Sequence, residues 1–206
     1  MKKSCLFVIL TLAAAAAFGQ GAPITGTAPV SLVIGTSIPG MPFTVDVHVD
    51  LTNVTGVCNT TVPAVLGGYS LPIAFTPAQA TFVSAAACTD PQFSAAPTFT
   101  APATANASGQ VTIASSQVNP NAPVGNVCVA RLTFQSISSG SLTVLGTGSL
   151  SSALQPCVGG GPVLIPYSGS AAAFGVGQIP TLSPLMLMLL ALALAGVATL
   201  TGVMKK

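Results

Sequence analysis

The stretch FTVDVHVDLT, residues 43–52, decides the fold class of this chain. Its apolar residues occupy every second position, and polar residues fall between them. A period of two places alternate side chains on opposite faces of an extended strand, so the stretch predicts a β-strand with one buried face. The predicted buried face carries Phe43, Val45, Val47, Val49 and Leu51. The predicted outer face carries Thr44, Asp46, His48, Asp50 and Thr52.

Similar alternating runs continue along the chain at residues 30–34, 69–75, 80–85, 110–116, 126–137, 141–150 and 162–174. Turn-forming clusters such as NPNAPVGN (119–126) and SSG (138–140) separate them, and no run has the period of an amphipathic helix. About seven to nine short strands joined by such turns are typical of an all-β sandwich. We therefore predict a single immunoglobulin-like or jelly-roll β-sandwich over residues 30–176.

Three segments resemble a known family. GMPFTVDVHVDLTNVTGV (40–57), GGYSLPIAFTPAQATFVSA (67–85) and VCVARLTFQSISSGSLTVLG (127–146) are similar in order and spacing to cohesin-like, carbohydrate-binding-module-like sandwiches. The turn Phe75-Thr76-Pro77 departs from the family, which has an Asp there. The resemblance implies a nine-stranded jelly-roll-like sandwich that is used for binding, and it does not name the ligand.

The amino terminus has the pattern of a secretory signal peptide over residues 1–19, in which Lys2 and Lys3 precede a short apolar run. Cleavage before Gln20 would remove Cys5 and leave residues 20–29 as a linker. Four cysteines remain, namely Cys58, Cys88, Cys128 and Cys157. An even number of cysteines in an exported chain predicts disulfides, because the compartment outside the inner membrane is oxidising.

The pairing of these cysteines can be argued from the expected hairpins. If 69–75 pairs with 80–85, Cys88 returns toward Cys58, and if 126–137 pairs with 141–150, Cys128 lies near Cys157. This favours Cys58–Cys88 and Cys128–Cys157 among the three pairings that four cysteines allow.

The predicted outer face of 43–52 places Asp46, His48 and Asp50 two residues apart. Carboxylates beside an imidazole could hold a cation, but the outer pair would lie about 13 Å apart along a strand, too far to bind one ion together. We interpret this face as solvated and expect no metal and no cofactor.

Catalysis is not expected either. His48 is the sole histidine, both aspartates near it lie on its own strand, and no GxSxG motif is present. The few charges of the sandwich are Asp46, Asp50, Asp90 and Arg131. Because no basic surface is available to neutralise phosphates, nucleic acid is excluded as a partner.

The carboxyl terminus carries a second uncharged apolar run at residues 184–203, long enough to cross a bilayer as a helix. It lies between IPTLS (Ile179, Pro180, Thr181, Leu182 and Ser183) and the basic pair Lys205-Lys206. Residues 177–206 resemble the IPTL-type sorting signals of Gram-negative bacteria, which exosortase-like membrane peptidases recognise. Pro184 and Leu185 depart from the Glu-Trp usual in that family, and lysines replace its arginines.

Together these features predict an exported, non-enzymatic surface protein. Its precursor would be anchored in the inner membrane and processed by an exosortase-like peptidase, then found at the cell surface or in the extracellular matrix. The expected ligand of the sandwich is an extracellular polysaccharide or a surface protein. The alternative is a structural surface or biofilm protein with a single-pass anchor and no small ligand. The absence of Trp argues against strong stacking on sugars.

Overall fold

The computed structural model describes residues 24–58, 60–88, 93, 95–117, 123–152 and 163–175. The predicted signal peptide, Asp90, Cys157 and the whole of the predicted sorting signal lie outside the described residues. The described residues form no helix with the length and hydropathy of a membrane span.

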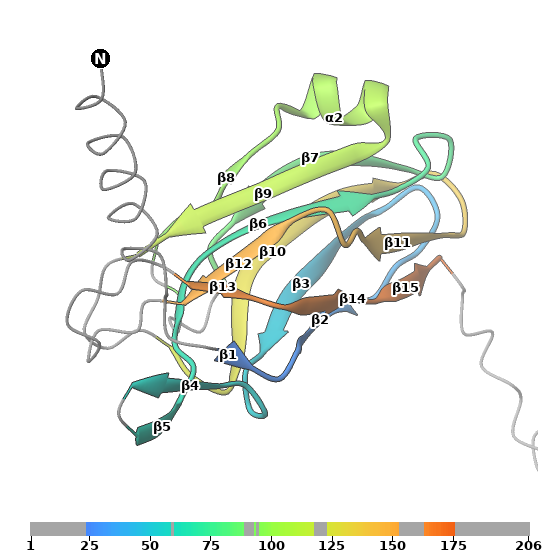
Figure 1. Cartoon of the computed structure of the whole chain (residues 1–206). Helices are drawn as coiled ribbons and strands as arrows, with labels where there is room; N and C mark the ends of the chain where they lie inside the picture. The colour runs from blue at the N-terminus through green and yellow to red at the C-terminus, as the bar shows by residue number, and fades with distance from the viewer. Residues whose placement is uncertain are drawn as a thin grey trace, which may run out of the picture. The chain divides into compact units, whose positions relative to one another are not determined.

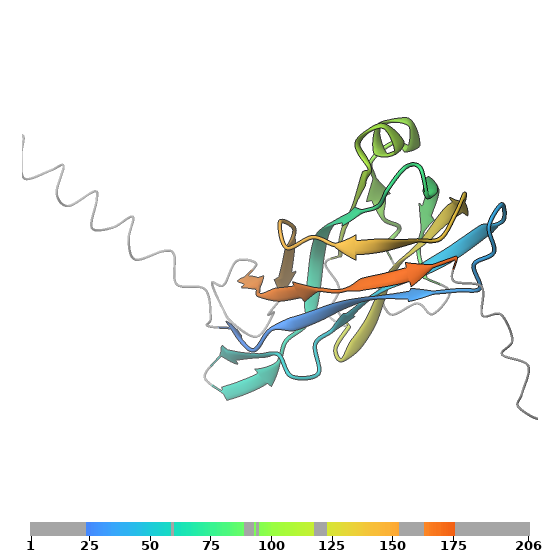
Figure 2. The ribbon, with the colours of Figure 1, turned by 90° about the vertical axis from the view of Figure 1, so that its right-hand side faces the viewer.

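Two β-sheets form the body of the molecule (Figures 1 and 2). The first, called the β3 sheet, is ordered β14 (Tyr167–Gly169), β2 (Ala28–Ile34), β3 (Pro42–Asp50), β10 (Asn126–Ser136) and β7 (Ala80–Ala86). The strands pair antiparallel except β14 and β2, which are parallel. The stretch that predicted the fold is thus a central strand, β3.

The second sheet, called the β6 sheet, is built around β6 (Leu66–Ala74). One side of β6 pairs with β9 (Gln110–Ser116), which pairs with β8 (Thr98–Phe99). The other side pairs with β11 (Gly140–Val144) and β12 (Ser149–Ser152) in succession, and beyond them lie β15 (Ala171–Phe174) and β13 (Val163–Ile165). A small separate sheet contains β1 (Ile24–Thr25), β4 (Thr55–Cys58) and β5 (Thr60–Pro63).

The core lies between the two sheets and follows the predicted alternation. Phe43, Val45, Val47 and Val49 are buried, whereas the polar residues between them are exposed or half-buried. Rings from both sheets meet inside, as Phe43 of the β3 sheet stacks on Phe174 of the β6 sheet with centroids 4.9 Å apart. The predicted sandwich, with its inward face on residues 43–51, is confirmed.

One hydrogen bond crosses the core. The Tyr69 hydroxyl on β6 donates to the Val129 carbonyl on β10 at 2.8 Å, and Tyr69 is buried. Val129 sits where the register of β10 against β3 shifts between Cys128 and Ala130. A bulge frees a carbonyl from the ladder, and the Tyr69 hydroxyl satisfies it inside the core.

Both expected hairpins are wrong. Residues 69–75 belong to the β6 sheet and 80–85 to the β3 sheet; likewise 126–137 lies in the β3 sheet and 141–150 in the β6 sheet. The turns at 75–79 and 137–139 therefore carry the chain from one sheet to the other. Alternation specifies which face of a strand is buried, but the same pattern suits a partner in either sheet, so it could not distinguish these crossovers from hairpins.

The structure adds a short helix to the predicted strands. A short helix, α2 (Pro102–Ser108), joins β8 to β9 and contacts β7. It begins with Pro102 in the first turn and ends at Gly109, whose positive φ suits a helix C-terminus. At seven residues it is too short for a hydrophobic period to reveal it, and packing against β7 stabilises it.

Both sides of the sandwich are partly covered. On one side, residues 163–174 run as β13, β14 and β15, pairing in turn with the β6 sheet, the β3 sheet and the β6 sheet again. On the other side, the free edge of β7 meets the α2 residue Asn106, which bonds the Phe82 backbone. Free edges invite pairing with other chains, and these contacts reduce the edge that is open to such pairing.

Candidate functional site

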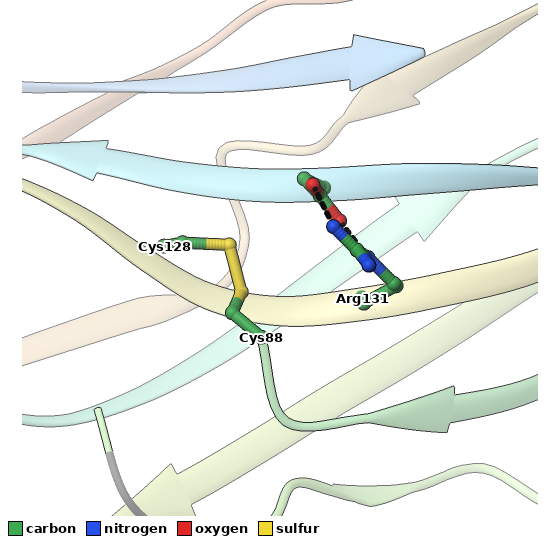
Figure 3. Close-up of polar contacts among 4 residues, drawn as sticks. Cys88, Cys128 and Arg131 are labelled. Carbon is green, nitrogen blue, oxygen red and sulfur yellow. Dashed lines mark hydrogen bonds and ion pairs between the residues drawn. A yellow bond between two sulfur atoms is a disulfide. The ribbon is translucent and has the colours of Figure 1, made fainter. Parts of the chain in front are cut away.

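The disulfide lies on the outer side of the β3 sheet, and its pairing corrects the expected one. Cys88 is joined to Cys128, with their Cα atoms 6.0 Å apart (Figure 3). Strand β7 pairs with β10, and Arg131 lies opposite Ala86, so the chain just beyond β7 returns beside Cys128. The expected Cys58–Cys88 pair is therefore wrong, because it assumed a hairpin where the chain changes sheet. Cys128 is then unavailable for the expected Cys128–Cys157 pair.

The predicted polar face of β3 points outward as expected, with Asp46, His48 and Asp50 half-buried. The structure brings to it two residues that the sequence did not connect with it. Arg131 of β10 lies opposite Asp46, and Cys128 lies opposite His48. Arg131 donates through Nε and Nη2 to the two Asp46 carboxylate oxygens at 2.6 and 2.7 Å (Figure 3). This hydrogen bonding and the Asp46 charge raise the pKa of Arg131.

Donor atoms of Asp46, His48 and Cys128 lie within 4.8 Å of one another, a spacing that suits a metal ion. Two of the three are already engaged. The Cys128 sulfur is bonded to Cys88, and both Asp46 oxygens bind Arg131. His48 alone remains, and one imidazole does not form a site. Asp50 does not join the cluster. It accepts hydrogen bonds from the Thr52 hydroxyl and backbone N–H, which lower the pKa of its carboxyl group.

The outer face of the β6 sheet is hollowed into a shallow groove of about 560 Å³. Two cross-strand rows form its floor. One row runs Ser149, Ser70, Ala114 and Thr98, and the next runs Ser151, Gly68 and Ser116. All these side chains are small, and Gly68 has none, which is consistent with the hollow over these rows. We call this surface the serine groove.

Gly68 lies in the floor of the serine groove and is buried by its neighbours. A Cβ atom at Gly68 would lie 2.9 Å from the Ser151 hydroxyl oxygen and 3.2 Å from the Ser115 carbonyl oxygen. A side chain there would press against Ser151 and the Ser115 carbonyl, which already lie close to Gly68. Glycine at this position therefore lets its neighbours on β12 and β9 pack closely across the middle strand.

The chemistry of the serine groove differs from that of the opposite face. The described charged residues, Asp46, Asp50 and Arg131, all belong to β3 and β10, so the groove contains none of them. Among the described residues, nothing engages the hydroxyls of Ser70 and Ser149, which remain free to donate and accept hydrogen bonds. The groove can therefore bind a surface through hydrogen bonds and close packing, without charge pairing.

Sequence reasoning missed this site. The residues SLSS (149–152), GGYS (67–70) and ASS (114–116) have no motif spacing, and serine is common throughout the chain. The sequence did show small residues at outward positions in three runs predicted as strands. It could not show that these three strands lie side by side, because that depends on the strand order.

Comparison with known proteins supports the fold. No protein-family model matches the chain, and no curated protein matches its sequence. Among solved structures, the cohesin module of a family 33 glycoside hydrolase from Clostridium perfringens ATCC13124 superposes with a TM-score of 0.51 at 9% identity, covering 73% of this chain and 96% of that one. A type II cohesin domain from the cellulosome of Acetivibrio cellulolyticus gives 0.51 at 13% identity, covering 75% and 99%.

A third structure holds a partner. It is the third cohesin ScaC of Acetivibrio cellulolyticus in complex with the ScaB dockerin, and it superposes with a TM-score of 0.50 at 13% identity, covering 72% of this chain and 99% of that one. Identities this low establish likeness of fold alone. The body of this chain is a cohesin-like β-sandwich, as the sequence resemblance had implied, and its described part also contains one short helix, which the sequence had not indicated.

Proposed function

We propose that this chain is an exported surface module that binds a partner protein through the serine groove. The observation that carries the proposal is the groove itself, an uncharged, hydroxyl-lined hollow on a sandwich whose edges are partly covered. The third cohesin ScaC, which shares the fold, is bound to a dockerin. A face of small side chains lets a partner backbone approach the sheet closely, and its free hydroxyls provide hydrogen bonds that fix orientation.

A protein partner is favoured over the polysaccharide considered from the sequence. Sugar binding commonly uses exposed aromatic rings as stacking platforms. In the described part of the chain six Phe residues and Tyr69 are buried, and Tyr167 is half-buried with its hydroxyl bonded to Leu145 and Gly148. Phe99 is the one exposed ring there, and it contacts Phe82 edge to face. Tyr69 is the one aromatic residue that lines the groove, and it is buried with its hydroxyl bonded to Val129 in the core.

Export and sorting complete the proposal. The signal peptide would deliver the chain across the inner membrane, and residues 177–206 would hold it there for an exosortase-like peptidase acting near 179–183. The support for this is the order of IPTLS, apolar run and dibasic end in the sequence. The chain is then the substrate of that peptidase, and its sandwich is the part displayed at the surface.

The groove is tested by site-specific photo-crosslinking in the native host. A photoreactive amino acid replaces Ser149, which is exposed in the groove, or Ser141, an exposed serine of β11 on the same sheet outside the groove. The expected result is a protease-sensitive adduct of defined mass from position 149 and none from 141. Ser149→Arg should abolish capture of the same partner, whereas Ser141→Arg should not. Equal crosslinking at both positions, or an adduct removed by glycosidases, would contradict a protein-binding groove.

A further inference from the structure

The connection between β2 and β3 exposes a continuous apolar segment. Residues 38–42, IPGMP, are all exposed, with Ile38 at 57% and Met41 at 55%. Ile137, in the turn after β10, is 50% exposed. Single exposed apolar residues are ordinary, but runs of several without a charge are usually functional. We call Ile38–Pro42 together with Ile137 the apolar tip.

The apolar tip is held in a fixed conformation. The Met41 N–H donates to the Ile38 carbonyl at 3.0 Å, and Gly40 has φ +82, so residues 38–41 form a type II turn with Pro39 and Gly40 at its centre. The Gly40 N–H donates to the Ser136 carbonyl at 2.9 Å, and the Gln135 side-chain amide donates to the Gly40 carbonyl at 2.6 Å. The turn is therefore pinned to the end of β10 beside Ile137, and it presents its apolar side chains without further ordering.

The chain leaves the sandwich at this same tip. The Gly175 N–H donates to the Ser37 hydroxyl at 3.1 Å, and the Ser139 hydroxyl donates to the Gly175 carbonyl at 2.7 Å. Ser37 precedes Ile38, and Ser139 follows Ile137 by two residues, so Gly175 is tied to both loops of the tip. In both views β15 ends on the side where the β2–β3 connection turns (Figures 1 and 2).

Eight residues, 176–183, separate Gly175 from the apolar run at 184–203. A fully extended segment of that length spans at most about 29 Å. The apolar run therefore cannot lie far from the apolar tip.

No described charged residue belongs to the apolar tip, so placing the tip against lipid would desolvate no charge. We propose that, while the chain still carries its apolar run, the apolar tip rests in the interface of the lipid bilayer. This inference rests on the anchoring role proposed above for residues 184–203.

The anchor explains why so small a tip is sufficient. Burial of a few apolar side chains would hold a free protein on a membrane only weakly. A tether of eight residues makes the contact intramolecular and raises the effective concentration of lipid around the tip. The consequence is a sandwich held upright on its β2–β3 end, with the faces of both sheets and the serine groove accessible.

The chain has no Trp, so a single indole can report on the tip. Full-length Ile38→Trp and Ile137→Trp proteins are reconstituted in vesicles of phosphatidylethanolamine and phosphatidylglycerol, with or without bromine on the acyl chains. Leu164→Trp is the matched control, because Leu164 is a 69% exposed apolar residue of β13, eleven positions before Gly175. Circular dichroism confirms that each variant folds, and flotation reports separately whether the anchor is inserted.

The expected result is that brominated lipid reduces the emission of Ile38→Trp and Ile137→Trp about twofold or more, as for groups at the headgroup and acyl-chain boundary, and leaves Leu164→Trp unchanged. If the proteins float but all three variants are quenched alike, the proposed membrane contact of the apolar tip is overturned and the anchor is not. If the proteins do not float, the proposed anchor is contradicted, and the membrane contact of the tip with it. A blue shift of Ile38→Trp that depends on protein concentration and not on bromine would assign the tip to a second copy of the chain, and would also overturn the proposal.

Discussion

The side-chain amide of Asn106 bonds both backbone groups of Phe82. Its Oδ1 accepts from the Phe82 N–H at 2.7 Å, and its Nδ2 donates to the Phe82 carbonyl at 3.0 Å. The amide thus pairs with the edge of β7 as another strand would, and it fastens α2 over that edge. One side chain satisfies two backbone groups that would otherwise be open to a neighbouring chain.

Replacing Asn106 tests this contact. Asn106→Asp keeps the size of the side chain but turns the donor into a carboxylate oxygen that faces the Phe82 carbonyl, so we expect a loss of about 2–3 kcal/mol in the free energy of unfolding at neutral pH. Urea denaturation of residues 20–178 measures it. Protonation of the new carboxyl restores a donor, so part of the loss should be recovered in acid. Asn126→Asp, at the exposed start of β10, is the control; an equal loss there would contradict the specific role of Asn106.

The Tyr69 hydroxyl gives a second prediction. Tyr69→Phe leaves the Val129 carbonyl without its donor inside the core. We expect this to lower the free energy of unfolding by about 1–2 kcal/mol. Tyr167→Phe should cost less, because Tyr167 is half-buried and water can reach the groups it bonds, Leu145 and Gly148. Thermal and urea unfolding of the two variants compares them. A smaller loss for Tyr69→Phe than for Tyr167→Phe would contradict the cross-sheet bond.

Tyr69 also makes stability depend on alkaline pH. Burial raises the pKa of Tyr69 above its ordinary value of 10.0. The folded state therefore keeps the proton that the unfolded chain releases, so this contribution to stability is complete below pH 10 and is lost as pH rises above it. Unfolding curves between neutral pH and strong alkali should show the loss in the natural chain and a smaller one in Tyr69→Phe. Identical pH profiles for the natural chain and Tyr69→Phe would contradict this role of Tyr69.

The cysteine pairing can be read from a non-reduced peptide digest of the exported protein. We expect a Cys88–Cys128 peptide and no free thiol, which would leave Cys58 and Cys157 to pair with each other. Because residues 88 and 128 are 40 apart, the chain-entropy model assigns this disulfide about 4 kcal/mol of stability. Cys88→Ser with Cys128→Ser should lower the unfolding free energy by an amount of that order. A Cys58–Cys88 peptide would contradict the structure.

The tail is tested by Pro180→Ala together with Thr181→Ala. Neither residue lies in the apolar run, so insertion should be unchanged while processing fails. In the native host the double variant should accumulate as a longer membrane form that retains Lys205 and Lys206, whereas the natural chain loses its C-terminal run. Mass spectrometry of the mature C-terminus distinguishes them. A natural protein found whole, and distributed like the variant, would leave an ordinary single-pass anchor.

Local pattern determined much of this protein. Alternation in residues 43–52 predicted β3, its buried face and the outward position of Asp46, His48 and Asp50, because the side-chain period of a strand depends on the backbone alone. The same reasoning located β2, β6, β7, β9 and β10 within a few residues, whereas the runs at 141–150 and 162–174 prove to be two and three strands. The resemblance of residues 40–57, 67–85 and 127–146 to cohesin-like sandwiches indicated the correct fold.

Tertiary structure decided which strands are neighbours. Short turns at 75–79 and 137–139 could equally have closed hairpins or crossed between sheets, and the choice depends on how the two sheets share a core. The Cys88–Cys128 disulfide, the pairing of Arg131 with Asp46, and the serine groove all follow from that choice. Each joins residues that lie on different strands, and a period of two along one strand carries no information about the strand beside it.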